Sequence, residues 1–308
     1  MIIKELPEDF IVKEVLSRQP QQAGKYRLYL LTKKGWNTED AASLLARVNN
    51  LRRKDVGFAG SKDKHAVTTQ FLTVPAPAFL HGTSELVVEP AGYTNQRLVV
   101  GDLAGNRFLI VARDLHEETC IPTRLRLLNL FGPQRFGLGE KNVAVGRALV
   151  KGSFGDACSL LKLPVEGRDY VKALRLFGHR RLRFFVHAYQ SFLWNLIAKC
   201  LHKSGPSSVP VVGFLSELSG DVGDAYAKVF EQEGITPKDF LVRSFPDIAS
   251  EGWERNLFVD VELTSRWELD EKHENRKKCT LSFFLPAGSY ATVVLAALFG
   301  CYEEPSRG

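Results

Sequence analysis

Residues 57–70 read Gly-Phe-Ala-Gly-Ser-Lys-Asp-Lys-His-Ala-Val-Thr-Thr-Gln, and they carry the most informative chemistry of the chain. One carboxylate, Asp63, stands between two lysines, shortly after a glycine and just before residues that predict a strand. A carboxylate flanked by cations stays ionised and is a poor base, but it can act as a nucleophile or stabilise a developing cation. On its own, however, an aspartate in such a turn is more often only solvated. The stretch therefore leaves a reactive aspartate and a surface turn as alternatives.

Strand patterns are dense in the first third of the chain and return near its end. We expect strands at residues 10–14, 25–32, 71–74, 106–112, 256–263 and 279–285, and helices at residues 37–48, 122–131, 139–149 and 187–203. In the strand at 106–112, Phe108 and Ile110 share one face. The centre of the chain is more helical. The pattern predicts an α+β fold with one sheet domain, residues 1–154 plus 258–308, interrupted by an insertion at about residues 155–257.

The charge of the chain is modestly basic and clustered. The net charge of its 308 residues is +6, with an isoelectric point near 9.0. Basic residues gather at 52–54, at 172–183 and at 276–278. Such patches bind phosphate backbones because they release condensed counterions, although any single cluster is more often a solvated face. Three clusters together favour a nucleic-acid partner.

Several function classes lack their usual signals. No apolar run approaches the ~18 residues of a membrane helix, and the first residues do not resemble a signal peptide. The five cysteines are odd in number, widely scattered and without a CxxC pair. No phosphate-binding loop, dinucleotide fingerprint or HExxH zinc motif is present. We therefore expect a cytoplasmic protein without membrane contact, and a reaction without a metal or another cofactor.

Two of the stretches resemble one enzyme family. Residues 57–70 are similar almost throughout to the catalytic motif of the TruD family of tRNA pseudouridine synthases, whose aspartate is the sole catalytic carboxylate. Residues 4–14, Lys-Glu-Leu-Pro-Glu-Asp-Phe-Ile-Val-Lys-Glu, resemble the N-terminal motif of that family. The resemblance implies that Asp63 is the catalytic nucleophile, that Lys4 is a cation near it, and that Phe10 lines the uridine pocket. A nearby cation would lower the pKa of Asp63. Without the resemblance, Lys4 is a solvated lysine and Phe10 a core residue.

Two later stretches extend the resemblance. Residues 129–137, Asn-Leu-Phe-Gly-Pro-Gln-Arg-Phe-Gly, and residues 284–292, Phe-Leu-Pro-Ala-Gly-Ser-Tyr-Ala-Thr, are similar to further TruD motifs. They imply that Asn129 binds the edge of the uracil, that Phe131 stacks near the base, and that Tyr290 contacts the uridine. The simpler alternatives are a polar residue at a helix end, a core aromatic residue and a turn tyrosine.

The resemblance spans nearly the whole chain and is weakest at residues 203–256. It implies a pseudouridine synthase-type domain, with a mixed and largely antiparallel sheet, and an inserted TruD-specific α/β domain. The implied reaction isomerises uridine to pseudouridine in tRNA, at position 13. It changes no oxidation state, so no cofactor is implied, and no obligate protein partner is evident.

Two other functions stay open at this point. One is an RNA-binding protein that keeps the fold and has lost catalysis, although the presence of Asp63 in its motif speaks against it. The other is a metal-dependent nuclease built on Pro7, Glu8, Asp9 and Glu14, a spacing that is common by chance.

Overall fold

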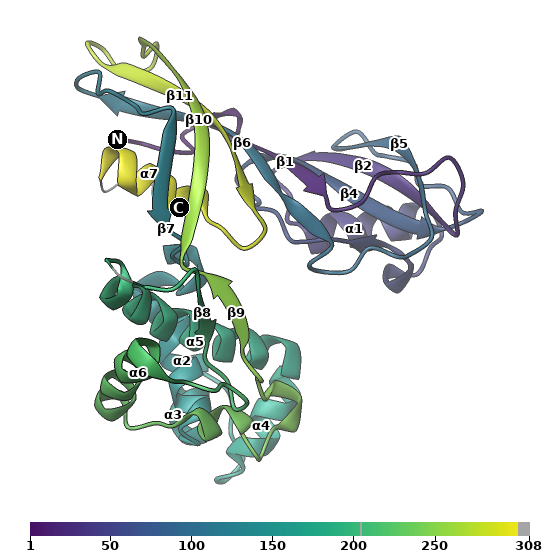
Figure 1. Cartoon of the computed structure of the whole chain (residues 1–308). Coiled ribbons are helices and arrows are strands. Elements are labelled where there is room, and N and C mark those ends of the chain that lie inside the picture. The colour runs from purple at the N-terminus through teal and green to yellow at the C-terminus, as the bar shows by residue number, and fades with distance from the viewer. Residues whose placement is uncertain (204, 301–308) are drawn as a thin grey trace. The chain divides into compact units, whose positions relative to one another are not determined.

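The computed structural model describes residues 1–203 and 205–300 (Figure 1). Residues 301–308, which end the predicted sheet domain, and Ser204 lie outside the described residues. The chain forms two compact units, one of Met1–Leu125 with Asp260–Gly308 and the other of Arg126–Val259. The second unit begins before residue 155, where the sequence analysis started the insertion. The assignment of an inserted TruD domain to residues 155–257 stays a prediction.

A nine-stranded sheet forms most of the first unit, and its strands β7 and β10 include a few residues of the second unit. Its path is β5-β2-β4-β1-β6-β11-β10-β7, with the short β3 paired to β4. The strands are β1 (Phe10–Leu16), β2 (Tyr26–Lys34), β3 (Gly57–Phe58), β4 (Val67–Pro75), β5 (Leu86–Thr94), β6 (Leu103–Leu115), β7 (Arg124–Leu128), β10 (Phe258–Leu269) and β11 (Lys277–Pro286). The pair β1–β4 is parallel, whereas β1–β6, β2–β4, β2–β5, β6–β11 and β10–β11 are antiparallel. The prediction of a mixed, largely antiparallel sheet is confirmed.

The helix α1 (Thr38–Val48) covers the part of the sheet formed by β2, β4 and β5. It begins where the sequence predicted, because the Asn37 side chain accepts a hydrogen bond from the Asp40 N–H at 2.8 Å. Its buried face, with Ala42 and Leu45, packs against Leu31 and other residues of the sheet. A second helix, α7 (Ala291–Phe299), follows β11.

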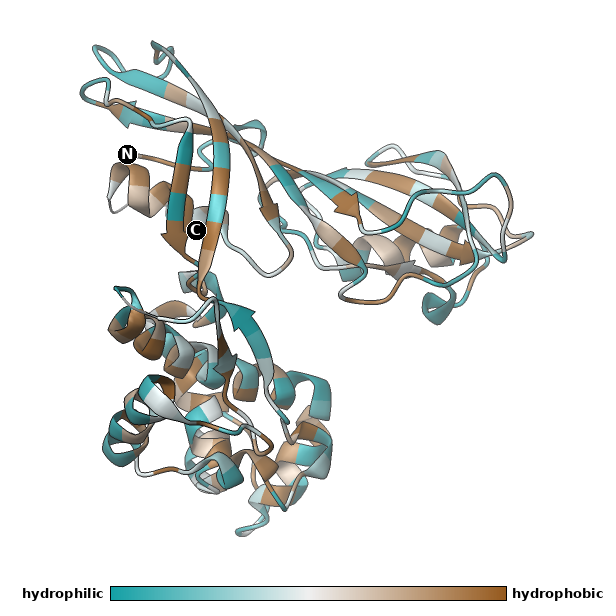
Figure 2. Cartoon of the chain, in the orientation of Figure 1, coloured by the Kyte–Doolittle hydropathy of each residue, from teal (hydrophilic) through white to brown (hydrophobic). Residues whose placement is uncertain are grey.

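The second unit is mainly helical. It contains α2 (Lys141–Val150), α3 (Phe154–Leu161), α4 (Tyr170–Phe177), α5 (His179–Leu201) and α6 (Gly220–Glu233), with the antiparallel pair β8 (Ser208–Val211) and β9 (Trp253–Asn256). Hydrophobic and hydrophilic residues alternate along its helices in Figure 2, as in helices with one buried face. Tyr189 and Trp194 of α5 are fully buried and form part of its core. None of the described helices is both long enough and apolar enough to cross a membrane.

One predicted element is wrong. Residues 122–131 were expected to form a helix on the spacing of Leu125 and Leu128, but residues 124–128 form the strand β7. The arginines Arg124 and Arg126 alternate with leucines, and this period of two is the strand pattern. In β6 the same alternation was assigned correctly, since Phe108 and Ile110 are buried and Leu109 is 40% exposed.

Candidate active site

The pairing of β1 with β4 brings two distant segments together. Ile11 lies opposite Val67 in this parallel pair, so both strands begin at the same end of the sheet. The segment that precedes β1 carries Lys4, and the loop that precedes β4 carries Asp63. The Lys4 Nζ donates a hydrogen bond to the Asp63 Oδ2 at 2.6 Å. The predicted neighbourhood of lysine and aspartate is therefore present.

The loop of residues 60–66, here called the Asp63 loop, leaves its carboxylate partly open to solvent. The Asp63 side chain is 37% exposed, whereas that of Lys4 is 8% exposed. The second carboxylate oxygen, Oδ1, accepts a hydrogen bond from the His65 N–H at 2.9 Å. One face of the carboxylate is thus held by protein donors, and the group can still be reached from outside.

Lys62, one of the two lysines that flank Asp63 in the sequence, binds a different carboxylate. The Lys62 ammonium forms an ion pair with Glu14 of β1, and these side chains are 6% and 0% exposed. Glu14 also accepts a hydrogen bond from the Phe71 N–H at 3.1 Å. The interpretation of Asp63 as flanked by two cations is therefore wrong for Lys62. The Lys62 ammonium is paired with Glu14 inside the unit, and Lys4 is the lysine that contacts the Asp63 carboxylate.

Buried polar side chains fix the main chain of the Asp63 loop. The Thr38 hydroxyl accepts a hydrogen bond from the Lys62 N–H at 2.8 Å and donates one to the Gln70 Oε1 at 2.8 Å. The Gln70 Nε2 in turn donates to the Gly60 carbonyl at 3.2 Å. Thr38 and Gln70 are 1% and 0% exposed. Gln70 was quoted within the motif, but nothing in the sequence distinguished its role from that of a surface residue.

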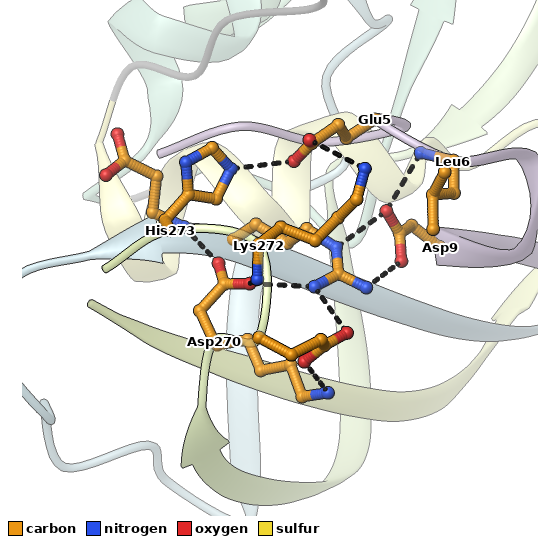
Figure 3. A network of polar contacts seen from close by, with 10 residues as sticks. Glu5, Leu6, Asp9, Asp270, Lys272 and His273 are labelled. Atoms are coloured by element: carbon orange, nitrogen blue, oxygen red, sulfur yellow. Dashed lines mark hydrogen bonds and ion pairs between the residues drawn. The ribbon is translucent and has the colours of Figure 1, made fainter. Parts of the chain in front are cut away.

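A second framework holds the segment that carries Lys4 (Figure 3). The Arg113 guanidinium on β6 binds both carboxylate oxygens of Asp9 at 2.9 Å. Its Nη1 donates to the Asp270 Oδ1 at 2.8 Å and to the Glu271 Oε1 at 3.0 Å. The Asp9 Oδ2 also accepts from the Leu6 N–H at 2.9 Å. Such bidentate pairs fix orientation as well as charge.

The charges of this second framework stabilise one another. Hydrogen bonding to Asp9 raises the pKa of Arg113 far above its ordinary value. Burial alone would raise the pKa of Asp270, but hydrogen bonds from the Asp114 and Lys272 N–H groups and from Arg113 outweigh it and lower that pKa. Arg113 and Asp270 therefore stay charged at neutral pH. In the sequence, Asp9 was named only within the N-terminal family motif and in the nuclease hypothesis, and Arg113 was not singled out.

Phe10 and Tyr290 lie in the same unit as Asp63. Phe10 is 6% exposed and packs edge-on against Phe108, with ring centroids 6.1 Å apart. The Lys4 Nζ lies 4.7 Å from the centre of the Phe10 ring, so Lys4, Phe10 and Asp63 are brought together. Tyr290 is half-buried and stands directly before α7.

Asn129 and Phe131 lie in the second unit, where they form a group with Trp194 and Arg255, here called the Arg255 cluster. Arg255 donates to the Asn129 carbonyl through Nε at 3.0 Å and to the Asn129 Oδ1 through Nη2 at 2.9 Å. Its guanidinium lies 4.0 Å from the centre of the Phe131 ring and 5.1 Å from that of Trp194. Phe131 is 7% exposed. The sequence analysis missed Arg255, which joins the two predicted residues.

The three basic clusters differ in their surroundings. In the first, Arg52 pairs with Asp55 and Arg53 with Glu39. All three residues of the third are paired, Arg276 with Asp114, Lys277 with Glu118 and Lys278 with Glu271. The second cluster covers exposed positions of α4 and of the first turns of α5, namely Lys172, Arg175, Arg180, Arg181 and Arg183. Among the three basic clusters, it has the fewest ion pairs within the described residues.

The residues of the nuclease hypothesis are engaged in other ways. Asp9 is bound to Arg113, Glu14 to Lys62, and Glu8 to Lys34 at the surface. Within residues 1–203 and 205–300, no group of three or more His, Cys, Asp or Glu residues is arranged to hold a metal ion. These carboxylates serve as ion-pair partners in the structure.

The comparisons with known proteins agree with one another. The sequence model of tRNA pseudouridine synthase D (TruD) matches residues 1–162 and 198–298. The tRNA pseudouridine synthase D of Anaeromyxobacter dehalogenans is 33% identical, and the alignment covers 96% of this chain and 92% of that protein. A relative from Methanosarcina acetivorans, named "Probable tRNA pseudouridine synthase D", is 27% identical over 94% of this chain and 90% of its own length.

A solved structure shares the fold of this chain. The crystal structure of the TruD protein from Methanosarcina mazei superposes with a TM-score of 0.72 and 22% identity, covering 97% of this chain and 93% of that chain. That likeness shows a shared fold, and the matched family model and the relative at 33% identity place the chain among the pseudouridine synthases. Within that class, the matched family model shows that the chain belongs to the TruD family.

Proposed function

We propose that this protein isomerises uridine to pseudouridine in tRNA and that Asp63 is the reacting group. The observation that carries the proposal is the contact of 2.6 Å between the buried Lys4 ammonium and the partly exposed Asp63 carboxylate. Family membership supports the reaction, and the rigid main chain of the Asp63 loop suits a group that must meet one atom of a substrate.

The reaction rearranges bonds without a change of oxidation state. The N-glycosidic bond of uridine breaks, the base turns, a bond forms between C1′ and C5, and the proton of C5 is lost while N1 gains one. Asp63 attacks the ribose or the base, or assists the removal of a proton at C2′. Lys4 orients the carboxylate for each of these roles.

The substrate must leave its stack to reach Asp63. From the family motifs that contain them, we assign three aromatic residues to the uridine, Phe10, Phe131 and Tyr290, each replacing about 1–3 kcal/mol of lost stacking. We assign Asn129 to the uracil edge through the donor or acceptor capacity of its amide. The exposed arginines of α4 and α5 would hold the flanking phosphates, which predicts strong salt dependence.

The proposed substrate is uridine 13 of tRNA, and the proposed location is the cytoplasm. The proposal needs no metal, organic cofactor or obligate protein partner. The test is to incubate the purified chain in EDTA with unmodified tRNA transcripts and to map pseudouridine along them. A transcript with cytidine at position 13 is the matched control. We expect one modified position in the first transcript and none in the second. Modification elsewhere would contradict the position, and the absence of product from every transcript would contradict the activity.

A further inference from the structure

A lysine outside the predicted motifs contacts the main chain of the Asp63 loop. Lys33 lies near the end of β2 and is 1% exposed. Its ammonium donates to the carbonyl of Asp63 itself at 3.1 Å and to the carbonyl of Lys62 at 3.4 Å. A third donation goes to the Trp36 carbonyl at 2.6 Å. One buried cation thus joins the loop to the turn that follows β2.

The surroundings of Lys33 are unusual for a buried lysine. Within the described part of the chain, no carboxylate lies within ion-pair distance of its ammonium, which is held by carbonyl oxygens alone. Its cross-strand neighbours, Thr68 on β4 and Leu86 on β5, are uncharged. A buried ammonium without a paired anion is costly to the fold. A group that costs stability and contacts the presumptive reacting residue is a candidate for function.

Resting on the proposed function, we infer that Lys33 is a positioning residue for Asp63. It acts through the main chain. Its ammonium holds the carbonyls of Lys62 and Asp63, which precede and follow the Asp63 Cα, and so limits rotation of the Asp63 backbone. Lys4 and the His65 N–H hold the carboxylate at the other end of the side chain. Together these contacts hold Asp63 at its main chain and at its carboxylate.

The charge of Lys33 also makes its contribution dependent on pH. Burial lowers the pKa of Lys33 to about 8, with attraction to Asp63 raising it and repulsion from Lys62 lowering it. On its own strand the next residue, Lys34, is paired at the surface with Glu8. Trp36, Thr68 and Leu86, which contact or face Lys33 from the other elements, carry no charge. Deprotonation removes one of three donors, so the contacts to the loop weaken as the pH rises through about 8.

The test compares Lys33→Met with Lys34→Met as the matched control. Lys34 is the adjacent lysine of β2, but it is exposed and paired only with Glu8. We expect Lys33→Met to lower the single-turnover rate constant on saturating tRNA by about 10- to 100-fold, the size of a displacement of roughly 1 Å at a reacting group. We expect its Kd for tRNA to stay within about threefold. The inference predicts that the wild-type rate declines above pH 8, and we expect the rate of Lys33→Met to lack that decline.

Three readouts decide the inference. Lys33→Arg keeps the charge and the donors, and it is expected to recover part of the rate that Lys33→Met loses. A rate constant of Lys33→Met equal to that of wild type, or equal losses in the methionine and arginine variants, would overturn the inference. Loss of the folded state in Lys33→Met, seen by circular dichroism, would overturn it too, since it would assign Lys33 to the fold. Absence of product from wild type would instead reject the proposed function itself.

Discussion

The Asp63 loop and the Arg255 cluster both contain residues that a family motif singled out, yet their surroundings differ. In the Asp63 loop, buried residues hold the main chain while the carboxylate is 37% exposed. In the Arg255 cluster, the side chain of Asn129 is 8% exposed and is bound by Arg255 and by the Asn256 carbonyl. The two motif residues therefore differ in their surroundings: the Asp63 carboxylate can be reached from outside, whereas the Asn129 amide that we assign to the uracil is held by its neighbours.

The largest effect that separates these two regions is expected at Lys4. Lys4→Met removes the cation from Asp63 and should lower the single-turnover rate constant by about 10²-fold, because the carboxylate loses its orienting donor. The control is Lys64→Met, which removes an exposed lysine next to Asp63 in sequence. At saturating tRNA we expect the control to react within about threefold of wild type. Equal losses in both variants would mean that the charge of the motif matters and the 2.6 Å contact does not.

The second effect concerns stability, and it tests whether Arg113 anchors the segment that carries Lys4. Arg113→Met leaves the buried carboxylates of Asp9 and Asp270 without their cation, and we expect a loss of about 3–5 kcal/mol in the free energy of unfolding. Urea denaturation at pH 7 measures it.

The same framework predicts a dependence on acid. The pKa of Asp270 is lowered in the folded state, so its contribution is present above its unfolded pKa and is lost as the pH falls through the folded value. Wild type should therefore lose stability on acidification more steeply than Arg113→Met. An unchanged midpoint in urea at pH 7 would show that the framework in Figure 3 does not anchor the segment.

A third and smaller effect is expected in the Arg255 cluster. Arg255→Met deprives the carbonyl and the Oδ1 of Asn129 of their donors, which should cost about 1–3 kcal/mol. Arg243→Met, at an exposed arginine of the same unit, is the control and should stay within about 0.5 kcal/mol. If Arg255→Met were as stable as its control, the contacts of Arg255 to Asn129 would not stabilise the fold.

A fourth effect concerns the alkaline behaviour of Lys33. Its pKa is about 8 in the folded protein and near 10.5 when unfolded, so the unfolded state binds more protons between these values. The free energy of unfolding of wild type, measured against that of Lys33→Met, should therefore rise as the pH increases from 8 to 10.5. If the difference in the free energy of unfolding between the two proteins stayed constant from pH 8 to 10.5, burial of the charged Lys33 would not destabilise the folded state.

Much of the fold could be predicted because it depends on local patterns. The alternation in β6 and the Asn37 cap of α1 are visible within a few residues. The spacing of Leu125 and Leu128 predicted a helix, because residues three apart share one face of a helix, but residues 124–128 form a strand.

The candidate site could be predicted only in part. Asp63 and Lys4 follow from their motifs, and the structure brings them into contact. Lys33, Arg113 and Arg255 could not be predicted, since their partners lie far away in sequence and a lone basic residue in a strand usually faces solvent. The pairing of β4 with β1 and β2, and of β1 with β6, brings the frameworks around Asp63 together.

The most direct measurement of the central claim is a single-turnover assay of wild type and Asp63→Asn on the same tRNA transcript in EDTA. The substitution keeps the shape of the side chain and removes its charge. We predict pseudouridine from wild type only, a rate constant lowered by at least about 10³-fold in Asp63→Asn, and similar Kd values for tRNA. Comparable rates from the two proteins would contradict the assignment of the reaction to the Asp63 carboxylate.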